Sequence, residues 1–198
     1  MKDFIFLIGP SGVGKSTLAQ KLYKHYDGVY LEQSMVPEFI IPKTCEDEGL
    51  FEEDTCFQNT IMQAKWFYEK GFRNIVALDF DDLRVRELPI IFKGFDFIIL
   101  RLYSSSAKQI KQQMEERHKS GTGLYYLEGV DISNRVISQR PLLPNEVKLD
   151  VFDKNKEEVF QEAVKLIDGT AALKDYEYQM PAKNQFRSWV QSNNLNQI

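Results

Sequence analysis

The stretch that decides the fold is Gly9-Pro10-Ser11-Gly12-Val13-Gly14-Lys15-Ser16-Thr17. It matches the pattern G-x-x-x-x-G-K-[ST] at every fixed position. The continuous apolar run at residues 4–8 precedes it and is typical of a strand buried on both faces. An amphipathic pattern over residues 16–26 predicts a helix directly after it. A buried strand, a glycine-rich turn and a helix in this order predict a loop that binds phosphate groups.

Each part of this loop has a separate task in binding phosphate. The three glycines can adopt backbone angles that other residues avoid, so the main chain can approach phosphate oxygens closely. The loop N–H groups then form an anion-binding nest, and the following helix directs its positive dipole end to the same place. Lys15 adds a full charge between the β- and γ-phosphates, and the Ser16 hydroxyl can bind Mg²⁺. We therefore expect residues 9–17 to bind ATP with Mg²⁺, with Thr17 as a helix-start hydroxyl in preference to a second metal ligand.

Strand-like and helix-like segments alternate outward from the loop. Further strands are predicted at residues 29–31, 75–78, 97–102 and 147–152. Helices are predicted at residues 55–70, from the serines at 104–106 to Lys119, at 132–138, and from the capping residue Asp153 through Ile167. Strands that alternate with helices predict an α/β fold with a mainly parallel sheet. A helical face with Phe186, Trp189 and Val190 predicts a C-terminal tail that docks on the same domain.

Composition and charge restrict the possible functions. The chain has 198 residues, 43% of them hydrophobic, which suits one domain that folds without disulfides or a structural metal. A net charge of −4 argues against a nucleic-acid-binding protein, which is usually basic. No apolar run approaches the roughly 20 residues that span a bilayer, and residues 4–8 are too few for a signal-peptide core. We therefore expect a cytoplasmic protein with no membrane partner, as a monomer or homodimer, with Cys45 and Cys56 as free thiols.

The fragment Gly-Pro-Ser-Gly-Val-Gly-Lys-Ser-Thr-Leu at residues 9–18 resembles the P-loop kinases of nucleotides and small molecules. Within that superfamily the loop is most similar to guanylate kinases and their relatives. The resemblance extends in strand and helix order over about residues 3–168 and implies a three-layer α/β/α fold with a five-stranded sheet. The segment by which guanylate kinases hold GMP is not recognisable between Glu32 and Asp54, so the resemblance does not identify the substrate.

The resemblance also implies a division of the chain. Residues 1–170 are expected to form the kinase-like domain, with an acceptor-side insert resembling that of nucleoside monophosphate kinases at 33–54 and an arginine-bearing lid at 118–144. Residues 171–198 would then be a helical tail. The insert has six acids in the nine positions 46–54, which indicate a solvated loop, with a cation site as the alternative.

A second acidic position completes the expected metal site. Asp79 follows the apolar run at residues 75–78, and in P-loop proteins an acid at such a strand end holds Mg²⁺, often through water. Leu-Asp-Phe-Asp at residues 78–81 also resembles a guanylate kinase sequence and implies the same role for Asp79. Asp81 and Asp82 are competing candidates, and all three acids could instead cap a loop or pair with Arg84 or Arg86.

The acceptor side is less distinctive. Glu32 ends the second predicted strand, where related small-molecule kinases have an acid that faces the acceptor hydroxyl. A carboxylate there can orient a hydroxyl and accept its proton. Glu38 is a weaker candidate of the same kind, and the polar side chains that could read a base from the neighbouring helix are those of Gln58, Asn59 and Gln63.

Arginines are expected to stabilise the charge on the transferring phosphoryl group. By position in the superfamily, Arg117 and Arg135 are the first candidates for this catalytic role, and Arg140 is the third, as a nucleotide-binding residue. Gly121 and Gly123 are candidate hinges of the lid. Tyr125 or Tyr126 could stack on a base, although packing is the more common role of a tyrosine.

The sequence as a whole predicts a Mg²⁺-dependent kinase that moves the γ-phosphoryl group of ATP to a small-molecule acceptor. The similarity of the loop to that of guanylate kinases favours a nucleoside monophosphate as acceptor. Two alternatives remain at this stage: a nucleotide-dependent ATPase or switch that acts on a protein partner, and a nucleotide-binding scaffold without turnover. Intact Lys15 and Ser16 argue against the scaffold.

Overall fold

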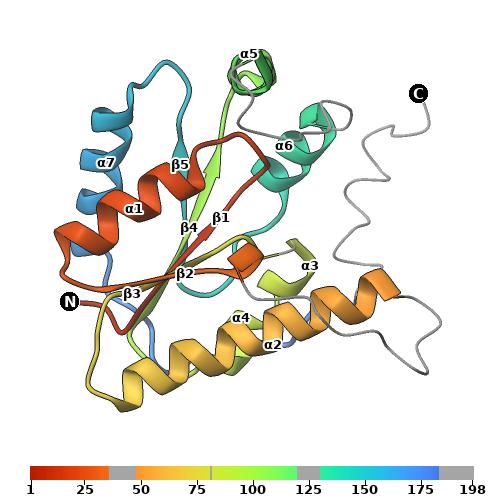
Figure 1. The fold of residues 1–198 in the computed structure, drawn as a ribbon. Helices are drawn as coiled ribbons and strands as arrows, with labels where there is room; N and C mark the ends of the chain where they lie inside the picture. The colour runs from red at the N-terminus through yellow and green to blue at the C-terminus, as the bar shows by residue number, and fades with distance from the viewer. Residues whose placement is uncertain (36–47, 81, 120–129, 183–198) are drawn as a thin grey trace.

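The computed structural model describes residues 1–35, 48–80, 82–119 and 130–182. Its centre is a parallel sheet of five strands in the order β2-β3-β1-β4-β5 (Figure 1). The strands are β1 (Phe4–Ile8), β2 (Val29–Glu32), β3 (Ile75–Leu78), β4 (Phe97–Tyr103) and β5 (Glu146–Asp150). This confirms the α/β fold with a five-stranded parallel sheet.

Helices cover both faces of this sheet, which gives three layers. The helices in chain order are α1 (Lys15–His25), α2 (Glu48–Glu69), α3 (Asp82–Val85), α4 (Leu88–Ile91), α5 (Ala107–Lys119), α6 (Val130–Gln139) and α7 (Lys156–Gly169). One face carries α1 and α7, and the other carries α2 and α4 (Figure 1). A short 3-10 helix, η1 (Gln33–Met35), follows β2.

The central strand β1 shows why the first apolar run is continuous. Phe4, Phe6 and Ile8 belong to the core under α2 and α4, where phenylalanine rings gather. Ile5 and Leu7 belong to the other core, against α1, α5 and α7. Since side chains alternate between the two faces of a strand and helices cover both faces, every position of β1 must be apolar.

The strands and helices predicted up to residue 167 are present, with shifted ends. Helix α2 begins at Glu48, seven residues before the expected start, so the acids that were interpreted as a loop fall partly within a helix. Helix α7 is capped by Asn155, whose side chain accepts from the backbone of Glu157 and Glu158, and not by Asp153 as expected. The expected tail helix lies outside the described residues.

The segment after α7 packs against the α2 side of the molecule. The Tyr176 hydroxyl donates to the Pro89 carbonyl (2.5 Å) and the Tyr178 hydroxyl to the Arg86 carbonyl (2.9 Å). Both rings pack on the phenylalanine-rich core. In the described part of the chain, no helix has the length and apolar character needed to cross a membrane.

Candidate functional site

The phosphate loop lies at the carboxyl edge of the sheet. Residues 9–14 connect the end of β1 to the start of α1, Glu32 ends β2, and Asp79 follows β3. These three strands are neighbours in the sheet and run parallel, so their carboxyl ends lie at one edge. A ligand in an open α/β sheet usually binds at this edge.

The glycines of the loop are required by space as well as by backbone angle. A Cβ at Gly9 would lie 2.5 Å from the backbone oxygen of Leu102, and one at Gly12 would lie 2.5 Å from Cγ of Met114. Gly12 and Gly14 also have positive φ angles, of 81° and 98°. The loop therefore packs directly on β4 and α5 in a conformation that only glycine adopts without strain.

Lys15 lies folded over the loop. Its Nζ donates to the carbonyls of Gly9 (3.1 Å) and Pro10 (3.3 Å) and lies 3.4 Å from Oδ1 of Asp79. Only 11% of its side chain is exposed. The ammonium is thus held at the loop and beside the acid that follows β3, where it can form charge-assisted hydrogen bonds with phosphate oxygens.

Ser16, Glu32 and Tyr30 form a second set of contacts at the same edge. The Ser16 hydroxyl donates to Oε1 of Glu32 (3.0 Å), and the Tyr30 hydroxyl donates to the other oxygen, Oε2. Burial raises the pKa of Tyr30 above its ordinary value, and so do the hydrogen bond to Glu32 and the negative charges of Glu32 and Asp79. The tyrosine therefore stays protonated and keeps its role as donor.

The oxygens of Ser16, Glu32 and Asp79 fit a hard cation such as Mg²⁺, which prefers oxygen ligands and usually shares them with phosphates. Asp79 has a positive φ of 71°, in the left-handed region that aspartate and asparagine tolerate better than most residues. Among the described residues, no three metal-binding side chains form a group that could hold a metal by itself. A cation held by the oxygens of this site would also take phosphate oxygens as ligands.

Two cavities include residues of the loop. One, of about 490 Å³, lies between the loop, α5 and the start of α7; its lining includes Gly12, Thr17, Gln113, Glu116, Lys154 and Val159. The other, of about 440 Å³, lies beside Lys15 and Asp79; its lining includes Gly9, Lys15, Gln33, Asp79, Phe80 and Ser133. Both volumes fall within the roughly 300–1,000 Å³ that small-molecule sites occupy.

Two of the three arginines expected on a lid, Arg117 and Arg135, lie on the helices α5 and α6. Arg135 lies on α6 and is half-buried, and its Nε is a buried donor without a hydrogen-bond partner among the described residues. Arg117 lies in α5, but its side chain falls outside the described set. Helix α6 brings Ser133 and Ile137 to the second cavity, and in Figure 1 it lies at the same end of the sheet as the loop.

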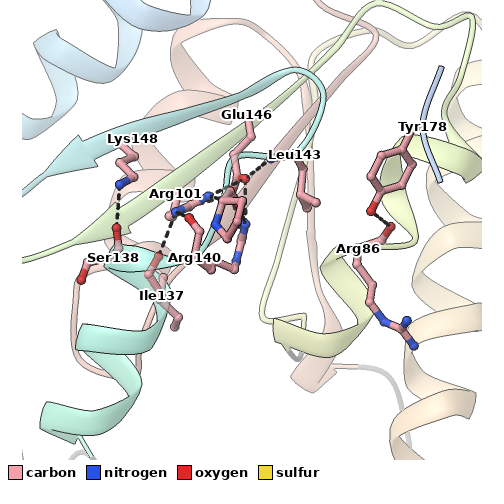
Figure 2. A network of polar contacts seen from close by, with 10 residues as sticks. Arg86, Arg101, Ile137, Ser138, Arg140, Leu143, Glu146, Lys148 and Tyr178 are labelled. Carbon is pink, nitrogen blue, oxygen red and sulfur yellow. Dashed lines mark hydrogen bonds and ion pairs between the residues drawn. The ribbon is translucent and has the colours of Figure 1, made fainter. Parts of the chain in front are cut away.

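Arg140 is part of a buried polar network, and not an exposed cation (Figure 2). Its guanidinium forms two hydrogen bonds with the carboxylate of Glu146, at 2.6 and 2.8 Å. Arg101 of β4 binds the same carboxylate at 2.7 and 2.8 Å, and all three side chains have no exposed surface. The expectation that Arg140 binds nucleotide is therefore not carried further, because its guanidinium is occupied inside the protein.

The network fixes the end of α6 to the sheet. Arg101 also donates to the carbonyls of Ile137 (3.0 Å) and Arg140 (2.7 Å), and Glu146 accepts from the backbone of Leu143 (2.7 Å). Burial would raise the pKa of Glu146, but the hydrogen bonds and charges of Arg101 and Arg140 outweigh it, so the pKa lies below its ordinary value. Glu146 is therefore ionised and bridges two arginines.

Several other expected residues do not reach the described cavities. Gln58 and Gln63 are exposed and Asn59 is half-buried on α2, and none of them lines either cavity. For a further set of expected residues, either the whole residue or its side chain lies outside the described part of the chain: Glu38, Asp81, Asp82, Gly121, Gly123, Tyr125 and Tyr126.

Sequence reasoning did not assign Tyr30 or Gln33 to the site. Both flank Glu32, so the signal that could have found them is the position of Glu32 at a strand end beside the loop. In a strand, Tyr30 and Glu32 share one face because side chains repeat every second residue. Gln33 is the first residue after the strand, and ligands of open α/β sheets bind just outside the carboxyl ends of the strands.

Comparisons with known proteins agree with the fold. No family model matches the chain, and no curated protein matches it. A gluconokinase from Sinorhizobium meliloti superposes with a TM-score of 0.61 at 16% identity, covering 86% of this chain and 94% of that one. A sugar kinase from Janibacter gives 0.56 at 15% identity, covering 85% and 95%. The YorR protein of Bacillus subtilis, solved with phosphorylated GDP, gives 0.51 at 17%, covering 83% and 95%. At such identities the likeness shows the fold, which is that of P-loop kinases.

Proposed function

We propose that this protein is an ATP-dependent phosphotransferase that moves the γ-phosphoryl group of ATP to a small-molecule acceptor. The observation that carries the proposal is the meeting of the phosphate loop, Lys15, Ser16, Glu32 and Asp79 at one edge of the sheet. A cavity lies on the loop near α5 and α7, and another lies beside Lys15 and Asp79. Two cavities at one phosphate loop suit a donor and an acceptor.

The loop and Lys15 would hold the β- and γ-phosphates, through main-chain N–H groups and the ammonium. Mg²⁺, held by Ser16 and Asp79, would supply charge neutralisation at the phosphates. In the transfer, an acceptor oxygen bonds to the γ-phosphorus, while the bond from that phosphorus to the bridging oxygen breaks and ADP leaves with the electron pair. Glu32 orients the acceptor and can take its proton.

The cavity near α5 and α7 is the better candidate for the nucleoside part of ATP. It borders the loop at Gly12 and Thr17 and extends away from Lys15 toward Gln113, Lys154 and Val159. Arg135 is proposed as a cation for the developing charge, on the basis of its buried and unpaired Nε. Arg117 is proposed for the same role from its position in α5.

The acceptor is the least constrained part of the proposal. The loop favours a nucleoside monophosphate, whereas two structural neighbours are named as a gluconokinase and a sugar kinase. Labelled ATP with a panel of nucleotides and sugars distinguishes these acceptors. Label found only as free phosphate, together with a stable protein complex, would instead support the alternative of an ATPase or switch that acts on a protein partner.

The first prediction concerns Lys15. Lys15→Ala removes the one ammonium that contacts the loop carbonyls, so it should abolish the thermal shift produced by Mg²⁺ and ATP. A ligand at 100 times its dissociation constant adds about 2.7 kcal/mol to the free energy of unfolding, which such a measurement detects easily. Lys24→Ala is the control, because Lys24 is exposed on the same helix. A full ATP shift in the Lys15→Ala variant contradicts the proposed function.

A further inference from the structure

On the premise of the proposed phosphotransferase, we propose that Gln33 determines acceptor specificity. Its side-chain oxygen accepts a hydrogen bond from a hydroxyl of the acceptor. The acceptor is a polyhydroxylated compound that is uncharged or cationic and has no phosphate group of its own.

Gln33 is the first residue after β2, directly beside Glu32, and starts the short helix η1. It lines the cavity beside Lys15 and Asp79, and only 8% of the residue is exposed. Within the described part of the chain its Oε1 has no hydrogen-bond partner, and the one other buried side-chain atom of this kind there is Nε of Arg135. Because buried polar atoms are almost always paired, an unpaired amide oxygen at a cavity wall indicates a donor that arrives with a ligand.

The charges around this cavity disfavour an acceptor that carries phosphate. Among the described lining residues, Lys15 is the one cation, and it is already engaged by two loop carbonyls and Asp79. Among the described residues that line the cavity there is no arginine, which is the usual partner of a bound phosphate. Asp79 would repel a second dianion next to the triphosphate of ATP.

The remaining polar groups suit hydroxyls. Ser133, on the α6 wall of the cavity, supplies a hydroxyl that can donate or accept a hydrogen bond. Gln33, which follows β2, supplies an amide to the same cavity. Phe80 and Ile137 add apolar surface to the lining. A neutral or cationic polyol brings no negative charge next to Asp79, whereas a nucleoside monophosphate or a sugar acid does.

The test uses the full chain and six probes. Glucose, glucosamine and uridine are hydroxylated and not anionic; gluconate, AMP and GMP are anionic counterparts. Each is assayed for transfer of label from ATP, and for binding by calorimetry in the presence of Mg²⁺ and ADP. We expect binding and label with at least one of the first three probes and not with the anionic three.

Gln33→Met keeps the size of the side chain and removes the amide. For the probe that is labelled, its KM should rise about tenfold, the effect of one hydrogen bond, while the KM for ATP stays unchanged. Gln33→Glu keeps an accepting oxygen and should retain most of the affinity. Gln20→Met is the matched control, since Gln20 is exposed on α1. Circular dichroism establishes that each variant is folded.

The outcomes separate this inference from the proposed function. Transfer to AMP, GMP or gluconate alone overturns the acceptor class, and an unchanged acceptor KM in Gln33→Met overturns the role of Gln33, while both leave the kinase intact. Binding of a hydroxylated probe that depends on Gln33 but gives no labelled product supports the inference and contradicts the kinase. Absence of binding and of label with all of glucose, glucosamine and uridine overturns the inference.

Discussion

At the scale of single residues, the site depends on what surrounds Glu32. The sequence placed an acid at this position to face an acceptor, and the structure adds that its two oxygens are bound by Ser16 and Tyr30. Tyr30 therefore holds the carboxylate in a fixed orientation toward the start of α1. This is a positioning role, because its hydroxyl acts on the acid and not on a ligand.

Tyr30→Phe tests that role. The change removes one donor to a carboxylate, and such a hydrogen bond contributes about 1.5–3 kcal/mol. We expect kcat to fall by tenfold or more while the circular dichroism spectrum is unchanged. Tyr23→Phe is a matched control, because the Tyr23 ring packs 5.6 Å from that of Tyr30 and its hydroxyl makes no hydrogen bond within the described chain. Equal kcat values in the two variants would rule out the positioning role.

At the scale of elements, the cap of α7 differs from the one that the sequence suggested. The sequence predicted Asp153 as this cap. The structure places Asp153 at a left-handed φ of 55°, while Asn155 forms a full capping box with Glu158. The turn after β5 decided between them, since a cap must itself have extended backbone.

Asn155→Ala should lower the free energy of unfolding by about 0.5–2 kcal/mol, because two backbone donors lose their partner. Asp153→Asn, which retains a residue tolerant of the left-handed region, should change it little. Urea denaturation of both variants measures the difference. A larger loss in Asp153→Asn than in Asn155→Ala would show that the cap is misassigned.

The buried network makes a second prediction at this scale. Glu146→Gln removes the buried carboxylate charge that Arg101 and Arg140 share, so it should destabilise the protein by about 3–5 kcal/mol. The lowered pKa of Glu146 sets the sign of the pH effect. Its contribution is complete above the ordinary carboxyl value of 4.5 and is lost as pH falls through the lower folded value.

Stability of the wild type should therefore fall below pH 4.5 more steeply than that of Glu146→Gln. Asp175→Asn is the control, because Asp175 is fully exposed opposite Lys93. Urea denaturation across this acidic range measures both slopes. Parallel slopes in wild type and Glu146→Gln would contradict the assignment of the charge to Glu146.

At the scale of the whole molecule, the segment after α7 connects the end of the described chain to the opposite layer. Tyr176 and Tyr178 reach the carbonyls of Pro89 and Arg86 and cover the phenylalanine-rich core. Burial raises the pKa of each from 10.0 to about 12. A raised pKa means that the folded state favours the neutral phenol.

The stabilising effect of both tyrosines is therefore present below pH 10 and is lost as pH rises toward 12. The double variant Tyr176→Phe/Tyr178→Phe should lose less stability than the wild type across this interval. Tyrosinate absorbance and unfolding, followed together during an alkaline titration, test this. An identical loss in the double variant would show that the segment does not contribute to alkaline unfolding.

The sequence by itself determined the sheet and the phosphate loop. Residues 4–8 are uniformly apolar and are followed by the glycines of the phosphate loop and Lys15. These signals are local, because strand burial, the backbone freedom of glycine and helix initiation act within about 20 residues of one another. The α/β fold and its five strands follow from the same local patterns. The resemblance to P-loop kinases was correct for the fold for this reason, since the loop and the strand that carries it are one local unit.

Only the tertiary structure decided how side chains from separate strands are used. Arg140 is an arginine in the segment where the sequence predicts a lid. It is bound inside the protein by Glu146, 6 positions later, and by Arg101, 39 positions earlier. Gln33 became a candidate because α6, a hundred residues later, forms the other wall of its cavity. Pairing and burial depend on contacts between distant segments, and a pattern along the chain does not specify which cation will be paired and which polar atom will be left for a ligand.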